Sequence, residues 1–419
     1  MFVYKNTLEY MSVKDLLKHQ HAMLIIVAAL GYFVDIYDLI LFNIVKKPSL
    51  LSIGVSKENL ENVGIHLFNM QMTGMLVGGI LWGVLGDKKG RLKVLFGSII
   101  LYSFANILNA FATTVESYSI IRFVAGVGLA GELGAGITLI SETMDKENRG
   151  YGTMVIVTFG ALGAVLAAVI ADMFDWKVAY IMGGVLGLAL LALRVKTMES
   201  KMFKGLEKTT SMRATFSYLL FHPKRFLKYL SCIMIGLPIW FIVGVLIALC
   251  ETFAKQMGVQ GAIKVSTAVA MSYIGLSVGD LLSGTLSQVL KSRKKVVVIF
   301  LFMAAIVIGV YLFTSNISVN TFYLLCFLLG FSTGFWAIFV TIASEQFGTN
   351  IRSTVTNTVP NFVRGAVVPI TLSFKSLTVS HNSTYAAIVV GSVCLILSLI
   401  AVLNLNETFG KDLNYSENI

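Results

Sequence analysis

The chain has 419 residues, of which 56% are hydrophobic and 13% charged, and its mean hydropathy is +0.80. A soluble globular domain carries roughly 25% charged residues, so this composition excludes an ordinary soluble protein. The net charge of +11 lies between apolar runs and not along one face of a soluble domain, which argues against a nucleic-acid partner. We therefore expect a chain embedded in the lipid bilayer.

Long apolar runs recur along nearly the whole chain, and a membrane-spanning helix needs roughly 20 such residues. Because the runs are continuous and not alternating, they predict helices and not the strands of a barrel. The fold class that we expect is an all-α membrane protein. The twelve predicted spans are residues 22–45, 65–85, 94–112, 118–141, 151–172, 178–196, 227–250, 264–290, 296–313, 320–344, 353–376 and 384–404.

A polar, basic segment divides the chain near its midpoint. We expect one six-helix bundle over residues 1–196 and another over residues 227–419. The linker over residues 197–226 is either an amphipathic helix on the membrane surface or a plain cytoplasmic connection. With the N-terminus inside, most of the 33 Lys and Arg residues fall on inner segments, as the positive-inside rule requires. We expect no secretory signal, an inner-membrane location with both termini cytoplasmic, and a functional monomer.

Nothing in the sequence indicates an enzyme. It has no nucleotide-binding loop, no metal-ligand pair and no nucleophile–base arrangement, so we predict no catalytic residue, metal or cofactor. The four cysteines lie in apolar runs without CxxC spacing, which is typical of small apolar packing residues. They are Cys232, Cys250, Cys326 and Cys394.

The two halves of the sequence repeat each other. Glu142 and Arg149 in the first half, seven residues apart, recur as Glu345 and Arg352 after an offset of 203 residues. Duplicated halves with a central binding site are typical of secondary transporters. We therefore expect two pseudo-symmetric bundles that alternate access to a site between them.

The most informative local motif is the loop Gly83-Val-Leu-Gly-Asp87-Lys88-Lys89-Gly90-Arg91-Leu-Lys93. Its glycines permit a tight turn, and an acid that bonds to helix ends in one state only would bias the equilibrium between states. The alternative is that its bases only fix the topology. After an offset of 201 residues Gln288 replaces the acid, so we expect stronger gating contacts in the first half. The predicted gating residues are Gly83, Asp87, Lys88, Gly90, Arg91, Glu142, Arg149, Glu345 and Arg352.

Together with Arg122-Phe-Val-Ala-Gly126-Val-Gly128, this loop resembles the signatures of the major facilitator superfamily. The Glu-to-Arg loops resemble those of its sugar-porter and metabolite–proton symporter branches. The resemblance covers nearly the whole chain and implies that helices 1, 4, 7 and 10 line a central cavity. It says far less about the substrate.

Several ionisable residues lie inside predicted spans. Asp35 and Asp38, in the first span, resemble the acid-Tyr-Asp pattern of phosphate and metabolite symporters, and Glu132 resembles an acid of the metabolite branch. A charged residue at the centre of a membrane helix costs about 2.5–3.5 kcal/mol, and burial disfavours its charged form, which suits a proton carrier. We predict proton coupling by Asp35, Asp38, Glu132 and Arg122. The alternatives are that these acids are structural partners of Arg122 or contact the solute directly.

The second half carries Arg364 within a span, while Glu132 corresponds to Phe335 in the repeat. The forked guanidinium of an arginine suits a carboxylate, so we assign protons to the first half and the solute to the second. The alternative is that Arg364 pairs with an acid such as Asp280 and that most of the aromatic residues only pack. The predicted solute-binding residues are Arg364, Asn361, Tyr37, Trp240, Trp336 and Phe335.

These residues predict proton-coupled uptake of a small organic anion or zwitterion, such as an amino acid or a carboxylate. One alternative is a transporter of a larger carboxylate-type siderophore, in either direction. Another is a membrane receptor or scaffold of the same fold that transports nothing.

Overall fold

The computed structural model describes residues 19–89, 91–134, 136–137, 149–198, 219, 221–411 and 415. The helices before the midpoint are α2 (His19–Ser52), the 3₁₀ helix η1 (Lys57–Asn59), α3 (Leu60–Lys89), α4 (Arg91–Asn109), α5 (Val115–Leu129), α7 (Arg149–Ala161), α8 (Gly163–Met173) and α9 (Trp176–Met198). Those after it are α11 (Pro223–Ile235), α12 (Leu237–Phe241), the π-helix η3 (Ile242–Ile247), α13 (Cys250–Gln256), α14 (Val265–Val289), α15 (Arg293–Phe313), α16 (Val319–Ser332), α17 (Trp336–Glu345), α18 (Thr349–Gly365), α19 (Val367–Ser380) and α20 (Ser383–Asn404).

Eleven of the twelve predicted spans fall mainly on one of these helices or on consecutive ones. In the described part of the chain, ten helical segments are long and apolar enough to cross a membrane, and Val94–Asn109 is a shorter apolar helix. The remaining predicted span, residues 118–141, contains most of α5 and runs on into residues outside the described part. The architecture therefore agrees with the predicted membrane protein of twelve helices.

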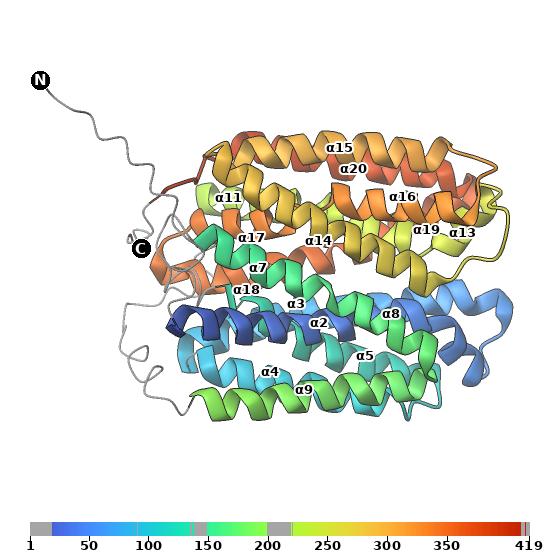
Figure 1. Ribbon diagram of the computed structural model, residues 1–419, viewed down its shortest axis with the longest axis horizontal. Helices are drawn as coiled ribbons and strands as arrows, with labels where there is room; N and C mark the ends of the chain where they lie inside the picture. The colour runs from blue at the N-terminus through green and yellow to red at the C-terminus, as the bar shows by residue number, and fades with distance from the viewer. Residues whose placement is uncertain are drawn as a thin grey trace, which may run out of the picture.

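The helices form two groups that pack along their length (Figure 1). The group up to α9 lies below and the group from α11 onward lies above in this view, with helix axes roughly parallel. The two groups meet where α3, α7 and α8 pack against α14, α17 and α18. Helix α2 begins and α20 ends at the same side of the molecule, which we call the terminal end. The opposite side is the far end.

Breaks in the long helices follow the sequence repeat. Helix α5 ends at a turn beginning with Ala130, and α16 ends at a turn beginning with Thr333, 203 residues later. The break between α7 and α8 at Leu162 likewise corresponds, within one residue, to the break between α18 and α19 at Ala366. These shared breaks support the predicted duplication. They matter for function because transporters place binding groups where a membrane helix is interrupted.

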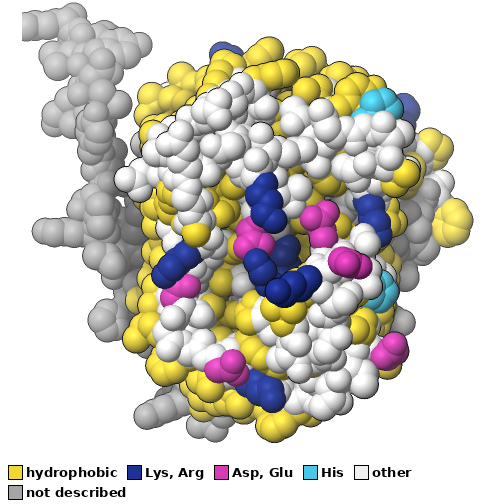
Figure 2. Space-filling view, turned by 90° about the vertical axis from the view of Figure 1, so that its right-hand side faces the viewer, with side chains coloured by type: hydrophobic (Ala, Val, Ile, Leu, Met, Phe, Trp, Pro, Cys, Tyr) yellow, Lys and Arg dark blue, Asp and Glu magenta, His cyan; other side chains and the backbone are white. Residues whose placement is uncertain are grey.

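The outward faces of the helices are apolar. Large side chains such as Phe104, Phe302 and Ile306 are more than half exposed, as a surface in contact with lipid requires. Figure 2 shows the far end, where charged side chains gather near the centre of the end face and hydrophobic ones form the rim. The distribution fits a multi-pass membrane protein seen along the membrane normal.

At the far end the two groups of helices are tied together by polar contacts. The Lys47 ammonium pairs with Glu251 at 3.1 Å, and the Ser266 hydroxyl donates to Asp172 at 2.6 Å. Each contact joins a residue before the midpoint to one after it. An exposed ion pair contributes only about 0–1 kcal/mol. The free energy of solute binding is therefore large enough to break these contacts and separate the two halves at the far end.

The terminal end is also closed among the described residues. Gly150, at the start of α7, lies so close to α14 that a Cβ on it would come within 2.5 Å of the Gln288 side-chain nitrogen. A Cβ on Gly284 would likewise meet Met154 at 2.5 Å. Among the described residues the two halves are in contact at both ends, and we call this the occluded arrangement.

Candidate functional site

A buried ion pair joins the two halves at the centre. The Arg364 guanidinium, on α18, lies 3.6 Å from the Asp35 carboxylate, on α2, and both side chains are completely buried. Asp35 accepts no hydrogen bond from the described residues, so its charge is balanced by Arg364 through space. Arg364 also donates to Asn361 at 3.4 Å and to the Tyr32 hydroxyl at 3.5 Å. Arg364 thus pairs with an acid, as the alternative supposed, but this acid is Asp35 and not Asp280.

Aromatic side chains surround the guanidinium. The Arg364 Cζ atom lies 6.0 Å from the ring centre of Tyr32, 5.9 Å from that of Trp240 and 5.8 Å from that of Trp336. These distances are at the outer range of cation–π contacts. The three rings therefore lie around the guanidinium, and an anion that binds there would compete with Asp35 for its N–H groups.

The same rings form part of the wall of a small cavity between the halves. Its volume is about 20 Å³, whereas an engineered cavity that binds benzene has about 150 Å³. The occluded arrangement must therefore widen before any solute enters. The lining residues are Tyr32, Ile36, Val157, Ala161, Ile239, Trp240, Val243, Tyr273, Leu276 and Trp336.

The other predicted solute residues lie differently. Asn361 is near the ion pair, and its amide donates to the carbonyls of Ala130 and Asn357, both at 2.7 Å. It thus caps the break that follows α5 and orients Arg364. Tyr37 donates to the Ala179 carbonyl at 2.8 Å, and Phe335 packs on Phe300. The structure does not bring these two rings to the cavity.

Glu132 has a partner that sequence reasoning missed. It forms a buried, bidentate ion pair with Arg194 of α9, which also donates to the Val27 carbonyl at 3.2 Å. The alternative in which Glu132 is a partner of Arg122 is therefore wrong. Arg194 lies near the end of a predicted span. Basic residues in that position are usually read as loop residues that set the membrane topology, so the sequence did not indicate an ion pair.

Arg122 and Asp38 form a second buried polar group in the first half. Arg122 donates to the Gln71 side chain and, at 3.4 Å, to the Tyr180 hydroxyl, and its guanidinium lies 4.5 Å from the ring centre of Phe42. Asp38 is completely buried, and both its oxygens lack a hydrogen-bond donor among the described residues. Arg122 is the cation that acts on Asp38 electrostatically.

Asp280 supports the aromatic wall. Its carboxylate accepts from the Ala337 backbone N–H at 3.0 Å, in the first turn of α17. An acid at a helix N-terminus satisfies an unpaired backbone donor and stabilises the helix. It thereby fixes the helix that carries Trp336.

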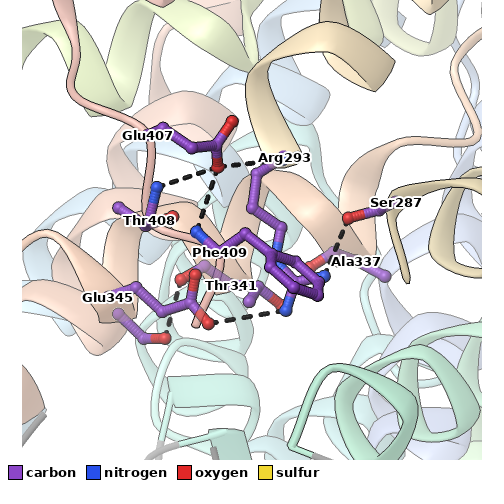
Figure 3. Close-up of polar contacts among 9 residues, drawn as sticks. Ser287, Arg293, Ala337, Thr341, Glu345, Glu407, Thr408 and Phe409 are labelled. Carbon is purple, nitrogen blue, oxygen red and sulfur yellow. Dashed lines mark hydrogen bonds and ion pairs between the residues drawn. The ribbon is translucent and has the colours of Figure 1, made fainter. Parts of the chain in front are cut away.

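A cluster of charged residues ties helix ends together at the terminal end (Figure 3). Arg293, at the start of α15, lies 3.6 Å from Glu345 at the end of α17 and donates to Ser287 at 2.8 Å. Glu407, beyond α20, accepts from the backbone N–H of Arg293 at 2.9 Å and from the Ser292 hydroxyl. The second half therefore has ionic contacts between its helix ends, and one of them uses Glu345, a predicted gating residue. The first-half loop residues with which these contacts would be compared lie outside the described part of the chain.

The ionisation of Glu407 reflects these bonds. Partial burial opposes the charged form, but hydrogen bonds from the Ser292 hydroxyl and from the backbone N–H groups of Arg293, Phe409 and Thr408 outweigh it and lower the pKa of Glu407 below its ordinary value. The charged carboxylate is thus the form that holds the end of α20 to the start of α15.

The other predicted gating residues are only partly described. Arg352 donates to the backbone carbonyls of Ser344 at 3.1 Å and Phe347 at 3.2 Å, and Gly83 lies against Thr358. The remaining ones have side chains, or whole positions, outside the described part of the chain: Asp87, Lys88, Gly90, Arg91, Glu142 and Arg149.

The comparisons with known proteins agree with this architecture. The family model described as Major Facilitator Superfamily matches residues 28–370. A Bacillus subtilis (strain 168) protein that bears the name of a niacin/nicotinamide transporter is 25% identical over 402 residues, covering 93% of this chain and 96% of that protein. The benzoate transport protein of Acinetobacter baylyi is 27% identical over 182 residues, which is 41% of this chain and 38% of that protein.

The solved structure of the proton:xylose symporter XylE, bound to 6-bromo-6-deoxy-D-glucose, has the same fold. The TM-score is 0.70 at 16% identity, and the match covers 93% of this chain and 97% of that chain. These findings confirm the predicted twelve-helix fold, and they confirm the prediction of a transporter and not an enzyme because the family and the relatives are transporters.

Proposed function

Because this chain belongs to the Major Facilitator Superfamily, and hence to a family of transporters, we propose that it is a proton-coupled symporter of small aromatic carboxylates. The observation that carries the proposal is the ion pair between Arg364 and Asp35, at 3.6 Å, beside a cavity walled by tyrosine and tryptophan rings. An arginine fork suits a planar carboxylate, and stacked or edge-on rings suit a flat aromatic body. The names of the relatives from Bacillus subtilis and Acinetobacter baylyi include niacin and benzoate, and both of these are aromatic carboxylates.

Competition for Arg364 explains why the solute and a proton travel together. In the empty carrier, ionised Asp35 balances Arg364. When a solute carboxylate takes the guanidinium, Asp35 must accept a proton or remain as an uncompensated buried charge. Leaving one member of a buried pair without its partner costs about 3–5 kcal/mol. The charges at the site balance in only two states: the carrier without solute, and the carrier with both solute and proton bound. Only these two states can close, so one proton accompanies each anion.

Asp38, Glu132 and Arg122 have secondary roles in this scheme. Asp38 and Arg122 form a second polar group in the first half. Asp38 is a second titratable acid on α2, and its ionisation would change the electrostatic potential at Asp35. Glu132 acts through its ion pair with Arg194, so we assign it a structural role. We also propose the inner membrane as location, cytoplasmic termini, a monomer, and gating by the loop residues named above.

The other functions considered have less support. An aromatic slot that closes to about 20 Å³ is better suited to one ring than to a large siderophore. An amino acid would bring an ammonium group toward a site whose described cation is Arg364. The hypothesis of a receptor without transport activity has no support from the relatives, which are named as transporters.

Uptake by the purified protein in proteoliposomes tests the proposal. An inside-alkaline pH gradient should drive accumulation of labelled nicotinate or benzoate. Benzamide, which lacks the carboxylate, and cyclohexanecarboxylate, which lacks the aromatic ring, should compete poorly. Arg364→Gln should reduce carboxylate uptake by at least about 100-fold, the equivalent of the roughly 3 kcal/mol lost when a buried pair is broken. Equal competition by benzamide and benzoate would reject the carboxylate role of Arg364.

A further inference from the structure

Two tryptophans in the cavity wall carry hydrogen-bond donors that nothing in the described part of the chain uses. The indole N–H groups of Trp240 and Trp336 are both buried and make no hydrogen bond. The Trp336 N–H interacts weakly with the Tyr32 hydroxyl, although the two atoms do not meet the geometry of a hydrogen bond. Trp240 is therefore the stronger candidate of the two. Trp240 is 4% exposed and Trp336 is 3% exposed.

Such donors are costly in a folded protein. A buried donor without an acceptor costs about 1–3 kcal/mol, and the large majority of buried polar groups have a partner. Trp82 shows the ordinary arrangement, since its indole N–H donates to the Val127 carbonyl at 2.6 Å. A phenylalanine would fill the cavity wall without this cost. We therefore expect the indole N–H groups to donate to an acceptor on the bound solute.

The positions of the two donors limit what that acceptor is. Both rings lie within 6 Å of the Arg364 Cζ atom, at 5.9 Å and 5.8 Å, and their centres are 6.3 Å apart in an edge-to-face arrangement. A carboxylate held by Arg364 would place its attached ring against these walls. An acceptor on that ring, and not on the carboxylate, would then meet an indole N–H once the cavity widens.

We infer that Trp240, assisted by Trp336, is a specificity-determining residue that selects aromatic carboxylates bearing a hydrogen-bond acceptor on the ring. An indole is a donor only, so it favours an unprotonated ring nitrogen over a C–H in the same place. The inference rests on the proposed function and narrows its substrate class to pyridinecarboxylates and related rings. A site with buried polar groups rejects a ligand that leaves them unpaired.

Competition against labelled benzoate uptake in proteoliposomes tests this inference. Nicotinate or isonicotinate should compete about tenfold better than unlabelled benzoate, which corresponds to about 1.4 kcal/mol. Trp240→Phe keeps a ring in the wall but removes the donor, so the ratio of nicotinate to benzoate competition, measured on the benzoate uptake that the variant retains, should fall to about one. Trp82→Phe, which removes an indole outside the cavity lining, should leave the preference unchanged.

Two results would overturn the inference while leaving the proposed function intact. One is wild-type protein that transports benzoate but shows no preference for either pyridinecarboxylate. The other is a preference that survives in Trp240→Phe, in Trp336→Phe and in the double variant. If wild-type protein takes up neither benzoate nor nicotinate under a pH gradient, the proposed function itself fails.

Discussion

Arg364 and Asp35 lie 3.6 Å apart although 329 positions separate them in the chain, and each is completely buried. The pair makes the two halves electrostatically dependent on each other at the point where the solute is expected to bind. Any movement that opens the cavity must separate these charges or supply replacements for them. The solute carboxylate and a proton are the replacements that we propose.

Asp35→Asn should therefore abolish accumulation driven by a pH gradient and preserve counterflow exchange of the solute. The neutral amide no longer competes for Arg364, so solute binding should also become independent of pH. Paired uptake and exchange in proteoliposomes, with and without an imposed gradient, measure both effects. Asp38→Asn leaves the Arg364 pair intact and is the matched comparison. If Asp38→Asn loses coupling while Asp35→Asn retains it, the carrier is Asp38.

The sequence predicted the helices well because each apolar run is long enough to span the bilayer and few alternatives exist for it. It also singled out Arg364 and Asp35 as candidate functional residues, since charged residues inside membrane helices are rare. It did not identify their pairing. The helices are apolar on most sides, so periodicity does not fix which face points inward. The same ambiguity made Tyr37 a predicted solute residue, whereas its hydroxyl bonds to Ala179.

Glu132→Gln should reduce stability more than it changes coupling. The variant leaves Arg194 buried without its carboxylate, which costs about 3–5 kcal/mol. We expect a lower yield of folded protein and a lower melting temperature in detergent, measured by fluorescence-detected size exclusion over a temperature series. The double variant Glu132→Gln/Arg194→Gln should recover part of the loss. A stable Glu132→Gln protein that only fails to accumulate solute would make Glu132 a proton carrier after all.

The proposed orientation predicts opposite labelling of two engineered cysteines. Thr209 lies in the linker over residues 197–226, and Asn59 lies in η1, at the far end. In a background without the four native cysteines, an impermeant thiol reagent applied to intact cells should label Asn59→Cys and leave Thr209→Cys unlabelled. Labelling of Thr209→Cys alone would invert the topology.

Close packing of α3 on α5 makes Gly126 sensitive to substitution. A Cβ at this position would come within 2.1 Å of the Gln71 backbone oxygen, so the two helices would have to separate. Gly126→Ala should destabilise the protein by roughly 1–3 kcal/mol, the usual cost of overpacking. Gly309, on α15, has no atom within 4 Å of such a Cβ and is the matched control. Equal melting temperatures of Gly126→Ala and Gly309→Ala would contradict this packing.

Glu407 predicts a pH dependence at the terminal end. Because its folded-state pKa lies below its ordinary value, the carboxylate contributes stability at pH values above its unfolded pKa of about 4.3. That contribution disappears as the pH falls through the folded-state pKa. Glu407→Gln should thus lower the melting temperature in detergent at about pH 7, and the difference from wild type should shrink as the pH falls below the ordinary glutamate pKa of about 4.3. Ser292→Ala, which removes one donor to this carboxylate, should show a smaller effect of the same sign. A difference between wild type and Glu407→Gln that stays constant across this range would show that the charge of Glu407 does not hold α20 to α15.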